Sequence, residues 1–121
     1  MCGINGFVSR QNSRDIETVN KMNNIIIHRG PDDDGVYFKN YDNYSIGIGM
    51  RRLSIIDKDN GKQPMYSDDK SKIVVFNGEI YNYKSLRNEL SQKGVLFKTD
   101  SDTEVILRLY EKEGLDSFCR L

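Results

Sequence analysis

The sequence predicts an α+β domain built on antiparallel sheet. Strand-like segments occur in groups along the 121 residues, and the helix-like segments do not alternate strictly with them. A doubly wound parallel sheet requires that alternation, so layered antiparallel sheet is favoured. Neither GxGxxG nor GxxxxGK followed by Ser or Thr occurs, so no loop of recognisable type binds ATP. The length suits a single domain with one hydrophobic core.

The first two elements are a short strand and a helix. Residues 4–8 form a brief apolar run that contains glycine, as expected of a buried strand. Residues 14–27 carry apolar side chains at helical intervals, and Ser13 is the expected N-cap. This helix should end before His28, because a Gly-Pro pair follows shortly after it.

Two strands are expected next, at residues 35–39 and 44–50. In the second strand, bulky side chains alternate with small ones, and Gly47 and Gly49 fall on the small face. Two glycines on one face indicate that another element packs very close there. A further buried strand is expected at residues 72–76, where Ile73 to Phe76 are apolar and precede a strong Asn-Gly turn signal.

Two helices complete the chain. The first is expected at residues 82–93 and closes on Gly94, and the second closes on Gly114. Ser101 and Glu104 have the spacing of a capping box at the start of the second helix. A short strand at residues 95–97 is expected between the two helices. The sequence shows no internal repeat, linker or low-complexity segment.

The composition excludes several classes of function. Eighteen basic residues balance 18 acidic ones and the isoelectric point is about 6.6, so nucleic acid is not an expected partner. No apolar run approaches the roughly 20 residues of a membrane helix, and no signal peptide is visible. We therefore expect a soluble, cytoplasmic protein whose Cys2 and Cys119 are free thiols. The spacing of metal-ligating residues supports no metal site.

Cys2 is the first candidate catalytic residue. A thiolate is a strong nucleophile toward acyl carbons when a base is nearby. Removal of Met1 would place an α-amino group, whose pKa is ordinarily about 7.7 to 8.0, on the same residue as the thiol. The alternative is that Cys2 is a small apolar residue at the start of a buried strand.

Three further features have both a chemical and a structural interpretation. Asn77 and Gly78 are either oxyanion donors or an ordinary turn. Arg52 either binds a carboxylate beside the glycine-bearing strand or is one more solvated base. Asp102 either binds an ammonium group or caps a helix. His28 is more simply explained as a loop-fixing residue than as a catalytic one.

Seven motifs in register carry a family resemblance that covers residue 1 to at least residue 113. They are MCGINGFV, HRGPDDDG, RRLSIID, QPM, VVFNGEIYNY, LRNEL and TDSDTEVIL. The chain resembles the N-terminal glutaminase domain of glutamine-hydrolysing asparagine synthetases, a class II, or N-terminal-nucleophile, glutamine amidotransferase domain. The resemblance implies an αββα sandwich of antiparallel sheets flanked by helices, and hydrolysis of glutamine to glutamate and ammonia through a thioester.

The resemblance also implies a role for each site residue. Cys2 would be the nucleophile and its own amino group the base. Asn77 and Gly78 would form the oxyanion hole. Arg52, preferred to Arg51 because Leu-Ser-Ile follows it, would bind the glutamine α-carboxylate. The residues expected to complete the glutamine pocket are Leu53, Ser54, Ile55 and Ile56 through their backbone, and Glu79 and Asp102 at the α-amino end.

The resemblance further implies what this sequence lacks. Residues 1–121 would be a partial amidotransferase domain, without the remaining sandwich strands and without a synthetase domain. ATP and Mg²⁺ would belong only to that synthetase domain, reached as a partner domain or subunit. An uncovered sheet face predicts a homo-oligomer or a missing partner chain. The ammonia acceptor would be aspartate or a sugar, and a non-catalytic glutamine-binding or subunit-interaction module is the alternative class.

Overall fold

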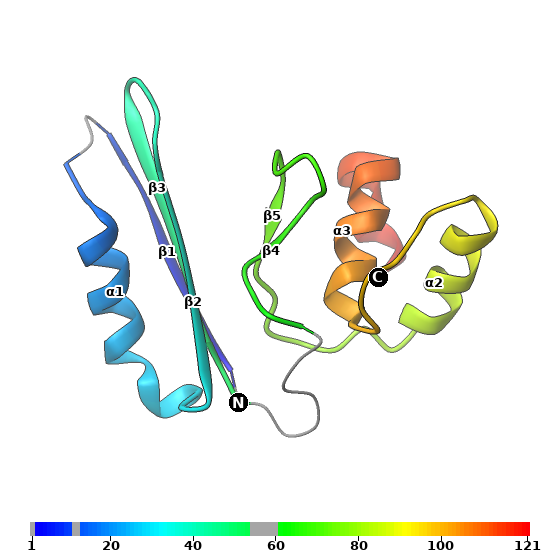
Figure 1. Ribbon diagram of the computed structural model, residues 1–121, viewed down its shortest axis with the longest axis horizontal. Helices are drawn as coiled ribbons and strands as arrows, with labels where there is room; N and C mark the ends of the chain where they lie inside the picture. The colour runs from blue at the N-terminus through cyan, green and yellow to red at the C-terminus, as the bar shows by residue number, and fades with distance from the viewer. Residues whose placement is uncertain (1, 11–12, 54–60) are drawn as a thin grey trace. The chain divides into compact units, whose positions relative to one another are not determined.

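The computed structural model describes residues 2–10, 13–53 and 61–121, and it divides into two compact units. Unit 1 comprises the described residues up to 53 together with residues 62–64 and 75–77. Unit 2 comprises residues 61, 65–74 and 78–121. Figure 1 labels the helices and strands of both units, and each unit is described by itself.

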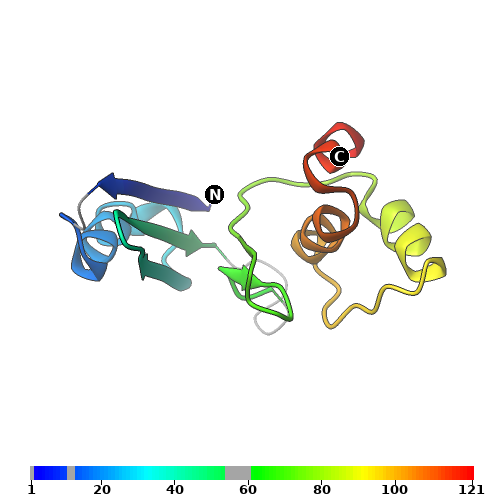
Figure 2. The ribbon, with the colours of Figure 1, turned by 90° about the horizontal axis from the view of Figure 1, so that it is seen from above.

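Unit 1 is a three-stranded antiparallel sheet with a helix along one face (Figures 1 and 2). Its strands are β1 (Gly3–Arg10), β2 (Asp33–Asn40) and β3 (Tyr44–Arg52), in the order β1-β3-β2. Helix α1 (Ile16–Ile25) and the 3-10 turn η1 (Ile27–Arg29) connect β1 to β2. The antiparallel α+β class and the three N-terminal strands are therefore confirmed.

Helix α1 packs against the glycine face of β3, as the sequence predicts. A Cβ atom added to Gly47 would lie 2.3 Å from Val19 Cγ2, and one added to Gly49 would lie 2.5 Å from Asn23 Oδ1. Val19 and Asn23 both belong to α1 and are buried. The two glycines are thus needed for space, because any side chain would push the helix off the sheet.

The ends of α1 differ from the sequence prediction. The helix is shorter than residues 14–27, and its N-cap is Asp15, whose carboxylate accepts a hydrogen bond of 3.0 Å from Thr18 N. The Ser13 hydroxyl lies 2.6 Å from the hydroxyl of Ser9 instead. The α-helix does end before His28, and the chain continues as the 3-10 turn η1 up to Gly30.

Unit 2 contains two α-helices, a 3-10 helix and a two-stranded antiparallel ribbon. Helices α2 (Tyr83–Gln92) and α3 (Asp102–Glu113) are followed by the 3-10 helix η2 (Gly114–Arg120), and the ribbon pairs β4 (Met65–Tyr66) with β5 (Ile73–Val74). The buried core lies between the two α-helices and consists of Leu86, Leu90, Val105 and Leu109. Gly94 and Gly114 end α2 and α3 with φ of 83° and 62°, which confirms both predicted helix ends.

Two strand predictions need correction. Residues 95–97 form a loop, in which Val95 and Phe97 pack against the core of unit 2 while Leu96 is 84% exposed. Buried and exposed side chains alternate there as they would in a strand, but the segment is a loop that packs against the helices. Strand β5 is also shorter than residues 72–76, because Phe76 N–H donates to the side chain of Gln63 and not to a strand ladder.

The capping box is only half formed. The Ser101 hydroxyl accepts a hydrogen bond of 3.1 Å from Thr103 N and caps α3, as predicted. Glu104 is 2% exposed and accepts hydrogen bonds from Lys98 N at 3.0 Å and from Thr99 N at 2.7 Å. Its carboxylate therefore fixes the loop before α3, a role that the capping-box interpretation missed.

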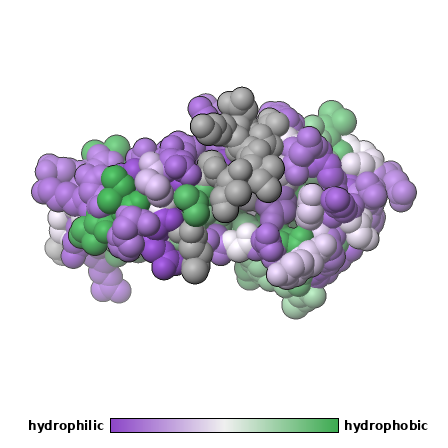
Figure 3. Space-filling model, turned by 90° about the horizontal axis from the view of Figure 1, so that it is seen from below, coloured by the Kyte–Doolittle hydropathy of each residue, from purple (hydrophilic) through white to green (hydrophobic). Residues whose placement is uncertain are grey.

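The surface view in Figure 3 shows a mainly hydrophilic face with separate hydrophobic areas. This agrees with a composition in which 30% of the residues are charged. Within residues 2–10, 13–53 and 61–121, no helix has both the length and the apolar character needed to cross a bilayer.

Candidate functional site

Cys2 lies immediately before β1, where the end of β3 runs beside it. The antiparallel register pairs Gly3 with Arg51, so the residues that follow Arg51 are carried toward the start of the chain. Leu53 N–H donates to Cys2 Sγ, with the nitrogen and sulfur atoms 3.5 Å apart. The thiol is free and its residue is half-buried. Cys2 is thus in direct contact with a residue predicted to line the glutamine pocket.

Asn77, which lies 75 positions further along the chain, also contacts Cys2. Its side-chain nitrogen Nδ2 donates to the Cys2 carbonyl oxygen at 3.0 Å. An amide NH₂ group has two hydrogens, so this bond uses one of them. Unit 1 therefore brings together Cys2, Leu53 and Asn77, which the sequence separates by 51 and 75 positions.

The neighbouring arginines at the end of β3 have different surroundings. Arg51 is buried on the α1 side of the sheet, where its Nε donates to Asn23 O at 3.1 Å and its Nη2 donates to Asn24 Oδ1 at 2.9 Å. Arg51 thus satisfies polar groups at the end of α1. Because side chains alternate along a strand, Arg52 falls on the opposite face, where it is half-buried.

In unit 2, Asp102 lies beside the segment that follows Asn77. Asp102 is the first residue of α3, and its Oδ2 accepts a hydrogen bond of 3.3 Å from Ile80 N. This bond brings Asp102 next to the exposed residues Gly78 and Glu79. Asp102 is therefore hydrogen-bonded to the residue that follows Glu79, the other acidic residue predicted to bind an ammonium group.

The predicted site residues fall into three groups. Cys2, Arg52, Leu53 and Asn77 belong to unit 1, and Gly78, Glu79 and Asp102 belong to unit 2. The remaining pocket residues, Ser54, Ile55 and Ile56, lie outside the described residues.

Sequence reasoning gave no role to Gln63, although it lies in the QPM motif. Its side-chain oxygen Oε1 accepts a hydrogen bond of 2.6 Å from Phe76 N, one residue before Asn77. A glutamine before a proline has no signature of its own, so only the three-dimensional contact reveals it.

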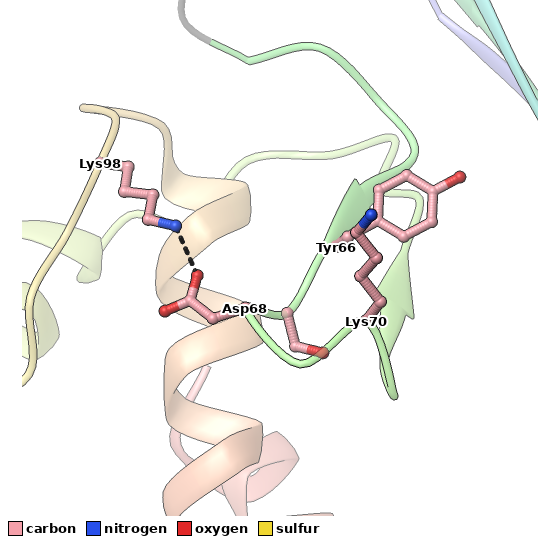
Figure 4. Close-up of a pocket in the computed structure, with 5 residues that line it drawn as sticks. Tyr66, Asp68, Lys70 and Lys98 are labelled. Carbon is pink, nitrogen blue, oxygen red and sulfur yellow. Dashed lines mark hydrogen bonds and ion pairs between the residues drawn. The ribbon is translucent and has the colours of Figure 1, made fainter.

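An open hollow of about 480 Å³ lies in unit 2 (Figure 4). Its lining includes Tyr66, Ser67 and Lys70, and Lys98 Nζ lies 2.7 Å from Asp68 Oδ1 across it. The hydrogen bond from Lys98, and then that from Arg108, lower the pKa of the Asp68 carboxyl. Among the described residues, none of those predicted from the sequence to bind glutamine lines this hollow, so it is not taken as the candidate site.

Comparison with known proteins identifies the class. Residues 1–121 match the glutamine amidotransferase domain family, so the chain belongs to that family. The chain is 47% identical over 114 residues to glutamine-hydrolyzing asparagine synthetase 1 of Bacillus subtilis, which covers 91% of this chain and 17% of that protein. It is 42% identical over 94 residues to asparagine synthetase B, glutamine-hydrolyzing, of Escherichia coli, which covers 78% of this chain and 16% of that protein.

A plant relative gives the same result. The chain is 41% identical over 118 residues to glutamine-hydrolyzing asparagine synthetase 1 of Arabidopsis thaliana, with 96% of this chain and 19% of that protein covered. The chain thus spans about a fifth of the length of these curated relatives, and the match lies in their N-terminal portion. The sequence resemblance to the amidotransferase domain of asparagine synthetases is confirmed.

Proposed function

We propose that this chain hydrolyses glutamine to glutamate and ammonia as the glutaminase part of an asparagine synthetase-like amidotransferase. Membership of the amidotransferase family and the names of the relatives support this assignment. The observation that carries it is the convergence of Leu53 N–H on Cys2 Sγ and of the Asn77 amide on the Cys2 carbonyl. A nucleophile and a hydrogen-bond donor for a developing oxyanion are the two groups that acyl transfer requires.

The proposed reaction has two steps. Cys2 Sγ attacks the side-chain amide carbon of glutamine, and the α-amino group of Cys2, freed by removal of Met1, takes the thiol proton. The carbon–nitrogen bond breaks, the proton is returned to the leaving nitrogen, and ammonia departs from a γ-glutamyl thioester. Water then attacks the thioester carbon, which releases glutamate and restores the thiol.

In both steps negative charge develops on the oxygen of the attacked carbonyl. The second hydrogen of Asn77 Nδ2 and the backbone N–H of Gly78 are the proposed donors to that oxygen. The hydrogen bond from Leu53 N–H would orient the sulfur for attack. Gly78 and Leu53 would donate through backbone N–H groups, and Asn77 through a side-chain amide that is already bonded to the Cys2 carbonyl.

The two ends of the glutamine backbone would be bound by opposite charges. Arg52 would pair with the α-carboxylate, since Arg51 is already engaged with α1 on the other face. Glu79 and Asp102 would bind the α-ammonium group. Leu53 and its three successors, Ser54, Ile55 and Ile56, would line the pocket through their backbone.

The names of the relatives support a proposal for the fate of the ammonia. Their names associate the domain with asparagine synthesis, so we propose transfer to a synthetase domain or subunit that amidates aspartate. ATP and Mg²⁺ would serve that second reaction, whereas hydrolysis is written with Cys2, glutamine and water alone. Residues 1–121 would then be part of an amidotransferase domain that acts in the cytoplasm.

A homo-oligomer is also proposed, from the sheet face opposite α1. Ile4 and Val8 lie on that face and are 50% and 73% exposed. Exposed apolar side chains on one sheet face commonly mark contact surfaces. Sedimentation equilibrium tests whether the chain forms an oligomer. A monomer at every accessible concentration would contradict the proposal.

The test of the catalytic proposal is labelling by a glutamine analogue that carries an electrophilic carbon. Intact mass is expected to show one adduct on a chain that lacks Met1, with the label on Cys2 and glutamate release abolished. The matched control is Cys119→Ser, which removes the other thiol and should leave labelling unchanged. Retention of Met1 in an active preparation would exclude the α-amino group as the base.

A further inference from the structure

We infer that Gln63 is a positioning residue for the oxyanion hole, and this rests on the role proposed above for Asn77. Gln63 does not touch the nucleophile or the substrate in the proposed reaction. Its side chain holds the backbone of the residue before Asn77, and through that residue it sets where the Asn77 amide points.

The contact itself is short and local. Phe76 N–H donates to Gln63 Oε1 at 2.6 Å, and both residues are half-buried. Strand β5 ends at Val74, so Phe76 lies beyond the strand ladder. The Gln63 side chain therefore supplies to Phe76 the acceptor that a neighbouring strand would otherwise provide. The next residue is Asn77, whose side chain is bonded to Cys2.

Gln63 is in turn held against the sheet of unit 1. A Cβ atom added to Gly35 of β2 would lie 1.8 Å from the Gln63 carbonyl oxygen and 2.7 Å from Pro64 Cδ. The backbone of residues 63–64 thus rests directly on β2 at its one glycine. Gly35 O also accepts a hydrogen bond of 3.3 Å from Asn23 of the buried face of α1.

These contacts form a continuous path from the sheet of unit 1 to Asn77. The path runs from Gly35 in the sheet to the Gln63 backbone, through the Gln63 side chain to Phe76, and on to Asn77. Asn77 and Phe76 lie in a loop, where the backbone has no ladder to fix it. An oxyanion donor acts only if it is held within a fraction of an ångström, so its loop needs such a support.

Two substitutions at residue 63 separate this role from a general effect on folding. Gln63→Met is nearly isosteric and removes the acceptor, whereas Gln63→Glu keeps an oxygen acceptor at the same place. We expect Gln63→Met to lower kcat for glutamine hydrolysis by roughly a hundredfold at nearly constant KM, because a donor displaced by about an ångström loses this much. Gln63→Glu should retain most of the activity.

Two readouts distinguish positioning from destabilisation. Alkylation of Cys2 by iodoacetamide forms no oxyanion, so its rate should be the same in the wild type and in Gln63→Met. In nitrogen-15 NMR spectra of the 121-residue chain, Gln63→Met should shift the Asn77 side-chain amide signals and remove the exchange protection of Phe76 N–H. Gln63→Glu should preserve both. An Asn77→Ala background should remove most of the effect of Gln63→Met on kcat, since the two residues act as one unit.

The NMR measurement also keeps the inference separate from the proposed function. If the wild type releases no glutamate but Gln63→Met alters the Asn77 amide as described, the catalytic proposal fails and the positioning contact stands. Unchanged Asn77 and Phe76 signals in Gln63→Met overturn the inference whatever the activity. Equal losses in hydrolysis and in alkylation, or a loss in Gln63→Glu as large as in Gln63→Met, also overturn it.

Discussion

At the scale of single residues, Asn77 is one of the two proposed donors to the developing oxyanion. Its amide already lies 3.0 Å from the Cys2 carbonyl oxygen. Loss of an oxyanion donor typically costs about 3 to 4 kcal/mol of transition-state stabilisation. Asn77→Ala should therefore slow glutamine hydrolysis about a hundredfold or more, measured as kcat for glutamate release.

The control for this prediction is Asn43→Ala, at an exposed position in the turn between β2 and β3. This change removes an amide of the same kind far from Cys2 in the fold of unit 1, and turnover should stay at the wild-type level. Wild-type turnover in Asn77→Ala would remove Asn77 from the mechanism.

At the scale of elements, the segment that follows η1 supports the end of β3. Asp32 N–H donates to Arg52 O at 3.2 Å, and a Cβ atom added to Gly30 would lie 2.4 Å from Arg52 N. Gly30 has φ of −154°, which any residue can adopt, so space is the reason for glycine here.

Gly30→Ala should therefore displace Arg52 and weaken its proposed ion pair with the glutamine α-carboxylate. Loss of much of a charge-assisted bond predicts a KM for glutamine raised about tenfold or more. The control is Gly47→Ala, which also disturbs β3 but through contacts with Val19 and Phe7 on the α1 side. Comparable loss of stability in both variants with an unchanged KM in Gly30→Ala would contradict this account.

At the same scale, the contacts of Glu89 predict how the stability of unit 2 depends on pH. Glu89 of α2 accepts hydrogen bonds from Lys93 at 2.6 Å and from Arg120 of η2 at 2.5 Å. These bonds lower the pKa of Glu89 from 4.5 to about 2. Because the folded pKa is depressed, this stabilisation is present above about pH 4.5 and is lost as the pH falls toward about 2.

Urea unfolding followed across that range checks the prediction. The free energy of unfolding of Glu89→Gln should fall less steeply with acid than that of the wild type. Added salt should flatten the wild-type curve, because the groups are near the surface and their interaction is screened. Identical acid dependence in the two proteins would show that the Glu89 contacts do not matter for stability.

Across the whole molecule, the elements that the sequence predicts best are those marked by a regular spacing of apolar residues. The periodicity of apolar residues gave the helices and the three strands of unit 1, and the paired glycines of β3 gave the close packing of α1. It failed for residues 95–97, where an alternating pattern lies on helices and not in a sheet. Periodicity reports which side chains are buried, and it does not report what buries them.

For the candidate site, the sequence predicts residues of suitable chemistry but not the contacts that support them. Cys2 and Asn77 were chosen for their chemistry and their place in recognisable motifs, and unit 1 brings them into contact. Gln63 accepts one hydrogen bond and Glu104 accepts several from backbone N–H groups that lie in irregular segments. Such bonds leave no period and no fixed spacing in a sequence, so they become visible only in the folded chain.

The two contacts that hold Cys2 have a consequence for the order of events during synthesis. Leu53 and Asn77 follow Cys2 by 51 and 75 positions, so neither contact exists until those residues have been translated. At about 5 to 20 residues per second, Asn77 is added roughly 4 to 15 s after Cys2. During that interval the first peptide bond belongs to an unstructured nascent chain and is open to an aminopeptidase. We therefore expect Met1 to be removed while the chain is still being synthesised.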